Sequence, residues 1–423
     1  MKKILLLFSL MLFFSSLSAQ EVRDSLRKDA LNVYMDASDY IRNEITYVNY
    51  VRDIKDAQLY IISTNQRTGS GGREYTYFFI GQNEFEGIDD TLTYISNPDE
   101  TSEIIRENQV QTIKLGLTQY VAHTPIGKYL MISFDRPITQ TVKIDKWNSW
   151  VFRASISGRA SGEQSYKSTS VNGSFSASRV TEELKTSLTA QYSHSSDKFE
   201  VDEEIIRSAN NTKSLNGLIV KSISDHWSVG SSLDAEASSY SNLDLSVNIM
   251  PGIEYDIFPY SESTRRQLRI TYKAGFSYVD YIDTTIYDKV KENLWLHSLS
   301  VNYEVIQKWG SADFTVGYSN YFHDWTKNNL SLDASLDLRI ARGLTLNLGG
   351  RAALVHDQLG LVKAGASVQD VLLRIRELAT QFTYFTRFGL TYTFGSIYNN
   401  VVNPRFGTVR RGGGGGGGGP DFR

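Results

Sequence analysis

The chain has 423 residues, a formal net charge of −3 and no cysteine. The lack of cysteine excludes disulfides, thiolate metal sites and a lipidated amino-terminal cysteine. The near-neutral charge argues against a nucleic-acid binder. The length leaves room for two or three domains.

The amino terminus has the pattern of a secretory signal peptide. Residues 1–3 are Met-Lys-Lys, residues 4–14 are apolar apart from Ser9, and residues 15–19 are mostly small. The apolar run is too short to cross a bilayer as a helix, which needs about 20 residues. We therefore expect residues 1–19 to be removed after Ala19 and the rest to be exported.

Residues 20–140 predict a small α+β domain with the element order β-α-β-β-β-α-β. The expected elements, in chain order, are 31–35, 39–51, 58–64, 74–80, 91–95, 101–121 and 128–134. The glycine-rich stretch 69–72 leads into a strand and lacks the Lys-Ser/Thr of a phosphate loop, so we interpret it as a hairpin connection. Metal binding is one possible role for the domain's aspartates, but helix caps and turns explain them better.

Residues 145–396 have the alternation of a transmembrane β-barrel. From Leu330 to Ile340 every second residue is apolar and those between are polar or charged, so the two kinds lie on opposite faces of a strand. A tilted strand of about 9–11 residues crosses a bilayer, and the whole region predicts an antiparallel transmembrane barrel of about twelve strands. The expected strands are 149–160, 166–179, 184–194, 213–224, 227–238, 243–257, 266–280, 293–306, 311–321, 329–340, 344–356 and 380–395.

The expected connections are long on one side of this barrel and short on the other. The long ones, 195–212, 281–292 and 357–379, all follow odd-numbered strands. Long outer loops and short periplasmic turns are typical of outer-membrane barrels, which places the amino-terminal domain in the periplasm. The six tryptophans all fall at expected strand ends, as the aromatic girdles of such barrels require.

Charged residues alternate with the apolar positions of several strands. A lipid-facing Arg or Lys costs about 2–4 kcal/mol at the bilayer midplane, so we expect these side chains to face the lumen. Both signs are interspersed, and the lumen is either a weakly selective pore or closed by its own salt bridges. The expected lumen-facing charges are Arg153, Arg269, Lys273, Asp333, Asp337, Arg339 and Arg351.

The last expected strand ends in a recognisable pattern. Arg387, Gly389, Tyr392 and Phe394 are a polar residue, a glycine and two aromatics, and they resemble the carboxy-terminal assembly signal of outer-membrane β-barrels. The resemblance implies recognition by the barrel assembly machinery, although the chain continues to Arg423. We interpret residues 397–423, which include eight consecutive glycines at 412–419, as a flexible tail or a tethered peptide.

The whole layout also resembles Gram-negative outer-membrane barrel proteins that carry a small periplasmic domain and form an uncharacterised family. The segments that carry this resemblance are 40–44, 47–53, 68–72 and 394–406. It implies a fold and a location in the cell outer membrane, with the domain and the tail in the periplasm. It brings no activity with it.

No catalytic pattern is present in the sequence. There is no Gly-x-Ser-x-Gly in a strand-to-helix context and no His-Glu-x-x-His, so we expect no enzyme, cofactor or metal. The remaining functions are a small channel or transport protein with a periplasmic accessory domain, or a scaffold that anchors a periplasmic or surface assembly. The expected partners are outer-membrane lipid, the assembly machinery and a periplasmic protein.

Overall fold

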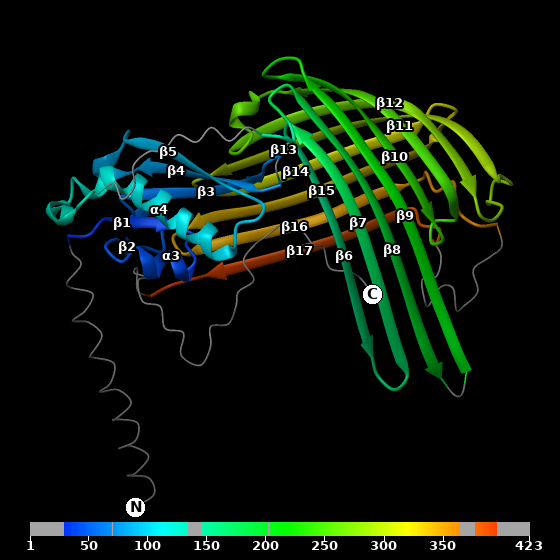
Figure 1. Ribbon diagram of the computed structural model, residues 1–423, viewed down its shortest axis with the longest axis horizontal. Coiled ribbons are helices and arrows are strands. Elements are labelled where there is room, and N and C mark those ends of the chain that lie inside the picture. Colours follow the sequence, from blue (N-terminus) through cyan, green and yellow to red (C-terminus); the bar gives the residue numbers. More distant parts are fainter. Residues whose placement is uncertain (1–28, 70, 134–144, 202–203, 364–376, 396–423) are drawn as a thin grey trace, which may run out of the picture.

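The computed structural model describes residues 29–69, 71–133, 145–201, 204–363 and 377–395 (Figure 1). These residues form a five-stranded sheet packed with two α-helices and a separate twelve-stranded sheet. The expected signal peptide and glycine-rich tail lie outside the described residues.

The five-stranded sheet has the order β2-β1-β3-β4-β5. β1 runs parallel to both of its neighbours, whereas β3, β4 and β5 form antiparallel hairpins. The elements are β1 (Asn32–Met35), α3 (Asp39–Glu44), β2 (Asn49–Tyr50), β3 (Leu59–Arg67), β4 (Arg73–Gly81), β5 (Asp89–Ser96) and α4 (Ser102–Val121).

The core of this domain lies between the sheet and α4. Thr101 caps the helix, because its side chain accepts a hydrogen bond from the backbone N–H of Ile104. Ile113 and Leu117, one turn apart, are both 1% exposed and pack in the same buried cluster as Phe79 of β4. This shared core makes the domain a unit of its own.

Two expected elements of the domain are wrong. The helix expected at 39–51 ends at Glu44, and the short strand β2 follows. The strand expected at 128–134 is absent from its described part, where a 3-10 turn (Pro125–Tyr129) is followed by irregular chain. Proline fixes its own φ and lacks an N–H, so it favours this turn over an extended start.

The second sheet has twelve antiparallel strands that pair strictly in chain order from β6 to β17. The chain is therefore mainly β, with the strand number that the alternation predicted. The strands are β6 (Trp150–Gly162), β7 (Tyr166–Val180), β8 (Leu184–Val201), β9 (Glu204–Ser222), β10 (Trp227–Ser238), β11 (Leu243–Asp256), β12 (Arg266–Tyr281), β13 (Lys291–Gln307), β14 (Gly310–Tyr321), β15 (Asp324–Ala341), β16 (Leu344–Val355) and β17 (Phe382–Tyr392).

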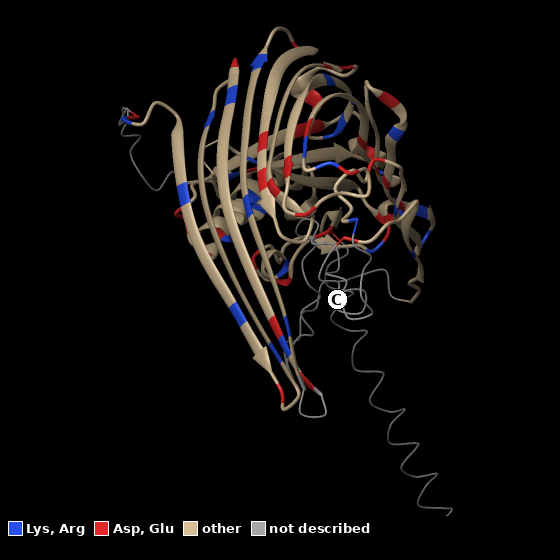
Figure 2. Ribbon diagram, turned by 90° about the vertical axis from the view of Figure 1, so that its right-hand side faces the viewer, with Lys and Arg blue, Asp and Glu red and all other residues tan. Residues whose placement is uncertain are grey.

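The sheet is strongly curled but open in this structure (Figure 2). β6 and β17 are its two edges, and no pairing joins them among the described residues. The closed ring expected from the sequence is therefore not seen.

Strand boundaries differ most in β8 and β9. The connection expected at 195–212 is mostly strand, because β8 continues to Val201 and β9 begins at Glu204. This hairpin extends beyond its neighbours at the end of the sheet away from the small domain (Figure 1). β13 also begins earlier than expected, at Lys291, so Trp295 lies inside this strand and not at its end.

The two faces of the sheet differ in chemistry. In the β14–β15–β16 register, Val316, Leu332 and Ala352 lie side by side on one face. Thr315, Asp333 and Arg351 form the adjacent row on the other face. The same division into one apolar and one polar face continues across the sheet. Large exposed side chains of the apolar face include Ile156, Leu188, Ile249, Leu299, Leu332 and Phe388.

Candidate functional site

The small domain lies against the end of the curled sheet where β6 starts and β17 finishes (Figure 1). Part of the contact is with the β15–β16 turn. Asp56 forms an ion pair with Arg342 (2.6 Å), and an Asp53 carboxylate oxygen accepts the Gly343 backbone N–H (2.9 Å). The other Asp53 oxygen accepts the N–H of Lys55 and so caps a 3-10 turn. The expected capping role of this aspartate is confirmed, and it is combined with docking.

Aromatic side chains of the domain meet arginines of the sheet. The Arg339 guanidinium lies 4.5 Å from the ring centre of Tyr34, and that of Arg265 lies 5.1 Å from the ring centre of Phe78. Each geometry fits a cation–π interaction, worth about 0.5–1 kcal/mol at an exposed site and more when desolvated. Burial raises the pKa of Tyr34 while the nearby Arg339 charge opposes that rise, so the Tyr34 hydroxyl stays protonated.

The domain also reaches both edges of the open sheet. Arg153 of β6 donates a hydrogen bond to the Gly71 carbonyl (3.3 Å) in the β3–β4 hairpin. Arg52 donates to the Phe394 carbonyl (3.3 Å), just after β17. These contacts place one folded unit between the first and last strands of the sheet.

Beside these contacts, a cavity of about 1200 Å³ lies between β3 of the domain and the large sheet. Its lining combines the β3 residues Thr64 and Gln66 with polar residues of strands between β8 and β13. Because one cavity touches residues of so many strands, the polar face is the inner face of the curl. The sheet residues that carry charge at this cavity include Lys185, Glu254, Arg269, Lys273 and Glu304.

The carboxylates on the cavity wall have neutral partners. Glu254 accepts hydrogen bonds from the hydroxyls of Tyr260 (3.1 Å) and Thr271 (3.0 Å), and Glu304 accepts one from the Gln267 amide. Arg269 donates to the Asn302 side chain (3.1 Å). Burial raises the pKa of Tyr260, which keeps its hydroxyl protonated as a donor.

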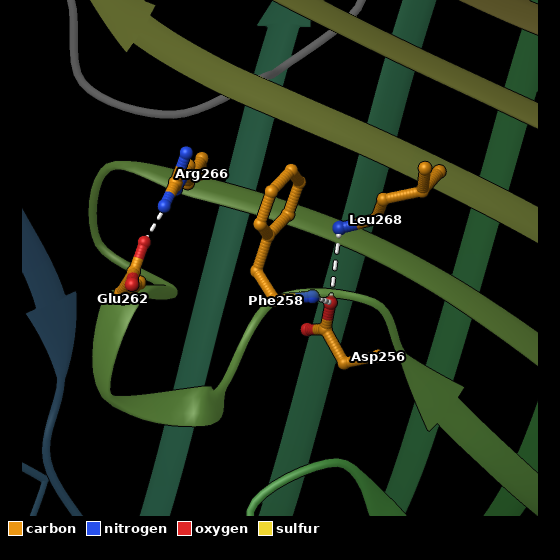
Figure 3. Close-up of polar contacts among 5 residues, drawn as sticks. All are labelled: Asp256, Phe258, Glu262, Arg266 and Leu268. Atoms are coloured by element: carbon orange, nitrogen blue, oxygen red, sulfur yellow. Dashed lines mark hydrogen bonds and ion pairs between the residues drawn. The ribbon is translucent and has the colours of Figure 1, made fainter.

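The β11–β12 loop forms one rim of the cavity (Figure 3). Asp256 is 1% exposed, and its carboxylate accepts the N–H groups of Phe258 (3.1 Å) and Leu268 (3.0 Å). Arg266 donates to Glu262 and lies over the Phe258 ring, and this hydrogen bond lowers the pKa of Glu262. These interactions fix the loop that carries Arg265 and Tyr260.

The predicted lumen-facing charges all lie on the polar face, in several separate settings. Asp333 pairs with Arg351 on the neighbouring strand, and Asp337 accepts a hydrogen bond from the Asn347 amide. Three others line the domain junction: Arg269 and Lys273 at the large cavity and Arg339 at Tyr34. Arg153 reaches the domain from the edge strand, as described above.

The residues of the predicted assembly signal occupy the edge strand β17 and the chain just after it. Arg387 lies opposite Gly349 of β16 on the polar face, and Gly389 lies opposite Asn347. The ring of Tyr392 stacks on that of Phe394 at 5.5 Å between centroids. Both rings are exposed.

Sequence reasoning missed a cluster at the opposite end of the sheet. Asn242, 5% exposed, donates hydrogen bonds to the carbonyls of Asp283 and Gly360 (both 2.9 Å) and accepts one from the Asp283 N–H (2.7 Å). Leu359 packs with Tyr281 and other inner-face side chains. The described start of the β16–β17 connection, residues 356–363, thus folds over this end of the polar face. The only sequence signal was the pair of leucines at 359 and 361 in an expected loop.

Residues 158–358 match a family model described as "Protein of unknown function, DUF481". The match begins within β6 and ends just after β16, so the chain is similar to this family in the twelve-stranded sheet alone. No curated protein matches the chain.

Two negative findings apply to the described part of the chain. None of its helices is both long and apolar enough to cross a membrane. No group of three or more His, Cys, Asp or Glu side chains within it is placed to hold a metal ion.

Proposed function

We propose that this chain is an outer-membrane β-barrel whose amino-terminal domain closes the periplasmic end of a passage for small polar solutes. The observation that carries this proposal is the apolar outer face of the twelve-stranded sheet. Ile156 is 83% exposed and Phe388 84% exposed, and exposed apolar side chains continue over the strands between them. Soluble monomers rarely expose apolar patches beyond about 300–600 Å². A bilayer would cover such a face.

Strand length supports the same proposal. The shortest strand of the large sheet, β17, has 11 residues, and a tilted strand needs about 9–11 to cross a bilayer. An open sheet edge does not occur in the hydrocarbon region, because its backbone groups would have no partners there. We infer that β6 and β17 pair in the membrane. The domain, which contacts both edges, would hold them near one another at one end.

The position of the small domain supports a gating role. Its β3 strand and the polar inner face line a common cavity, so a docked domain stands in the path of a solute at this end. At the β15–β16 turn the interface includes the ion pair Asp56–Arg342, in which the Arg342 side chain is 57% and the Asp56 side chain 19% exposed, and the hydrogen bond that the Gly343 N–H donates to Asp53. Exposed pairs contribute about 0.2–1 kcal/mol each. The interface also contains two cation–π contacts and the hydrogen bonds of Arg52 and Arg153, and we propose that these separate polar contacts break when the domain releases.

Planar-bilayer recording of the purified full chain tests this proposal. The double variant Asp53→Ala and Asp56→Ala should conduct more often than the unaltered protein, by about tenfold if the two contacts contribute about 1.4 kcal/mol together. The matched control is Asp39→Ala, because Asp39 pairs with Arg42 within the domain. Silence of both the unaltered chain and the double variant would refute the passage.

A closed scaffold is the second candidate, and a specific observation favours it. Residues 356–363, the described start of the β16–β17 connection, pack on the inner face at the far end, and Asp333 and Arg351 neutralise each other on the inner wall. A barrel closed at both ends would anchor other proteins and conduct nothing. Mild-detergent purification that recovers a stoichiometric periplasmic protein, together with silent recordings, would establish this role instead.

A further inference from the structure

The charged residues of the large sheet are sorted by strand. β6, β7, β16 and β17, which flank the open seam, contain lysine and arginine but no aspartate or glutamate. β10 and β11, near the middle of the sheet, contain aspartate and glutamate but no lysine or arginine. On the polar face, the basic wall is formed by Arg153, Arg159, Arg351 and Arg387. The acidic wall is formed by Asp234, Glu236, Glu254 and Asp256.

The basic wall is only partly neutralised by its own neighbours. Arg351 pairs with Asp333, and Arg153 donates to a neutral carbonyl. Among the residues that the structure describes, Arg159 and Arg387 form no ion pair within 4.0 Å. Both guanidinium groups are exposed on the edge strands. Their charge therefore acts on the space inside the curl.

The acidic wall is likewise only partly neutralised. Arg269 and Lys273 lie beside it on the polar face of β12, but among the described residues no ion pair within 4.0 Å joins them to the acidic wall. Glu254 and Asp256 accept hydrogen bonds from neutral hydroxyl and backbone groups, as described above. Asp234 and Glu236 lie on the same face of β10 and form no ion pair in the described part of the chain. Neutral donors stabilise a carboxylate without cancelling its field.

Closure of the sheet would set Arg351 and Arg387 of the basic wall opposite the acidic wall, while Arg153 and Arg159 of β6 would lie opposite β12. Once β6 pairs with β17, the strands half a turn from β16 and β17 are β10 and β11, because pairing follows chain order. This step rests on the barrel proposed above. A lumen with opposite charges on opposite walls has a field across its width and little net preference for either sign.

We propose that this transverse field selects small zwitterionic solutes, of the class of free amino acids and short peptides, over solutes with a net charge. A zwitterion aligns its ammonium group with the acidic wall and its carboxylate with the basic wall. An anion or a cation is attracted by one wall and repelled by the other. A neutral solute is attracted by neither wall.

Cysteine labelling tests the walls without requiring any solute to cross, and the chain has no cysteine of its own. Ser157→Cys lies on the polar face of β6 between Arg153 and Arg159, and Ser232→Cys lies next to Asp234 on β10. Anionic sulfonatoethyl and cationic trimethylammonioethyl methanethiosulfonate are the two probes. The anionic-to-cationic rate ratio should be about tenfold higher at position 157 than at 232, and 1 M salt should remove most of the difference.

Matched variants assign the effect to the wall. Adding Arg159→Gln to Ser157→Cys should lower that ratio several-fold, whereas Lys198→Gln, in the extension of β8, should leave it unchanged. Equal ratios at 157 and 232 would overturn the two walls while leaving the passage intact. No reaction with either probe at both positions would overturn the accessible walls and the open passage together.

Proteoliposome swelling then tests the solute class. Diglycine, a zwitterion, should enter faster than a neutral sugar of similar size and faster than dipeptides with a net charge. Arg159→Gln combined with Arg387→Gln should remove this advantage and make the passage favour cations. Entry of all these solutes at rates that follow size alone would overturn the selectivity while confirming that a passage exists.

Discussion

Gly116 shows how closely α4 approaches the sheet of the small domain. A Cβ atom at this position would lie 2.1 Å from the tip of the Phe79 ring, and Phe79 is 0% exposed. The ring is held in the domain core and has no open space in which to move. A helix-weakening glycine is therefore required here by packing.

We expect Gly116→Ala to destabilise the amino-terminal domain. Overpacking costs about 1–3 kcal/mol, and the gain in helix propensity of about 1 kcal/mol offsets only part of it. Urea unfolding of the full chain in detergent, followed by protease sensitivity of the domain, measures the change. Leu115→Ala is the control, because Leu115 is 65% exposed and should alter stability by less than about 0.5 kcal/mol. Equal stability of the two variants would contradict the close packing.

Buried tyrosines make the same domain sensitive to alkali. Burial raises the pKa of Tyr120 to about 12 and that of Tyr47 to about 12, from the ordinary tyrosine value of 10.0. The unfolded chain therefore releases these protons first, and domain stability should be complete below pH 10 and fall as the pH rises towards 12. The tyrosine Cζ chemical shift, assigned with Tyr120→Phe, should stay that of the neutral ring up to the unfolding transition. Ionisation of Tyr120 near pH 10 in the folded protein would contradict its burial.

At the scale of elements, the connections at the far end of the sheet behave as one unit. Asn242 has a φ of 58° in the β10–β11 connection and bonds to the backbone of two other connections. Ile286 donates its N–H to the Leu361 carbonyl at 2.8 Å, which joins the same two connections directly. One asparagine therefore links segments that are distant in the sequence.

Removing this amide should loosen all three connections. In Asn242→Gly, which keeps the positive φ without strain, hydrogen exchange at the Asp283 and Ile286 amides should increase about tenfold or more, because buried backbone groups lose their partners. Asn216→Ala, an exposed change in β9, serves as the control. Unchanged exchange in Asn242→Gly would mean that the connections hold together without it.

The sequence predicted strands well where one face is apolar and poorly where both faces are polar. Leu330 to Ile340 alternates strictly and is strand throughout β15. Residues 195–212 are mostly polar and were expected to be a loop, but they extend the β8–β9 hairpin. A strand that leaves an apolar environment needs no apolar face, so alternation cannot mark where it ends.

The sequence predicted the contacts of the candidate site less well than it predicted the strands. The alternation of apolar and polar residues predicted that Asp333 and Arg351 lie on the same face of the sheet, and the two side chains form an ion pair. The docking contact between Asp56 and Arg342 joins residues 286 positions apart, and no local pattern marks it. The apolar run at 128–134 was predicted to be a strand. A strand also needs a neighbouring strand with which to pair, and the residue pattern does not show whether one is available. Met131 is 92% exposed there.

For the whole molecule, the main question is whether the large sheet spans a membrane with its two ends on opposite sides. The small domain and the short β13–β14 turn lie at one end, and the long β12–β13 connection lies at the other. An apolar outer face between two polar ends fits a bilayer of about 30 Å hydrocarbon thickness. Neither end has to enter the membrane in this arrangement.

Cysteine accessibility on intact Gram-negative cells measures this most directly. Lys289→Cys, in the β12–β13 connection, and Lys308→Cys, in the β13–β14 turn, are matched exposed substitutions at opposite ends of β13. A polyethylene-glycol maleimide too large for porins should label position 289 on intact cells and position 308 only after the outer membrane is permeabilised. Equal labelling of both positions on intact cells would contradict a membrane-spanning sheet.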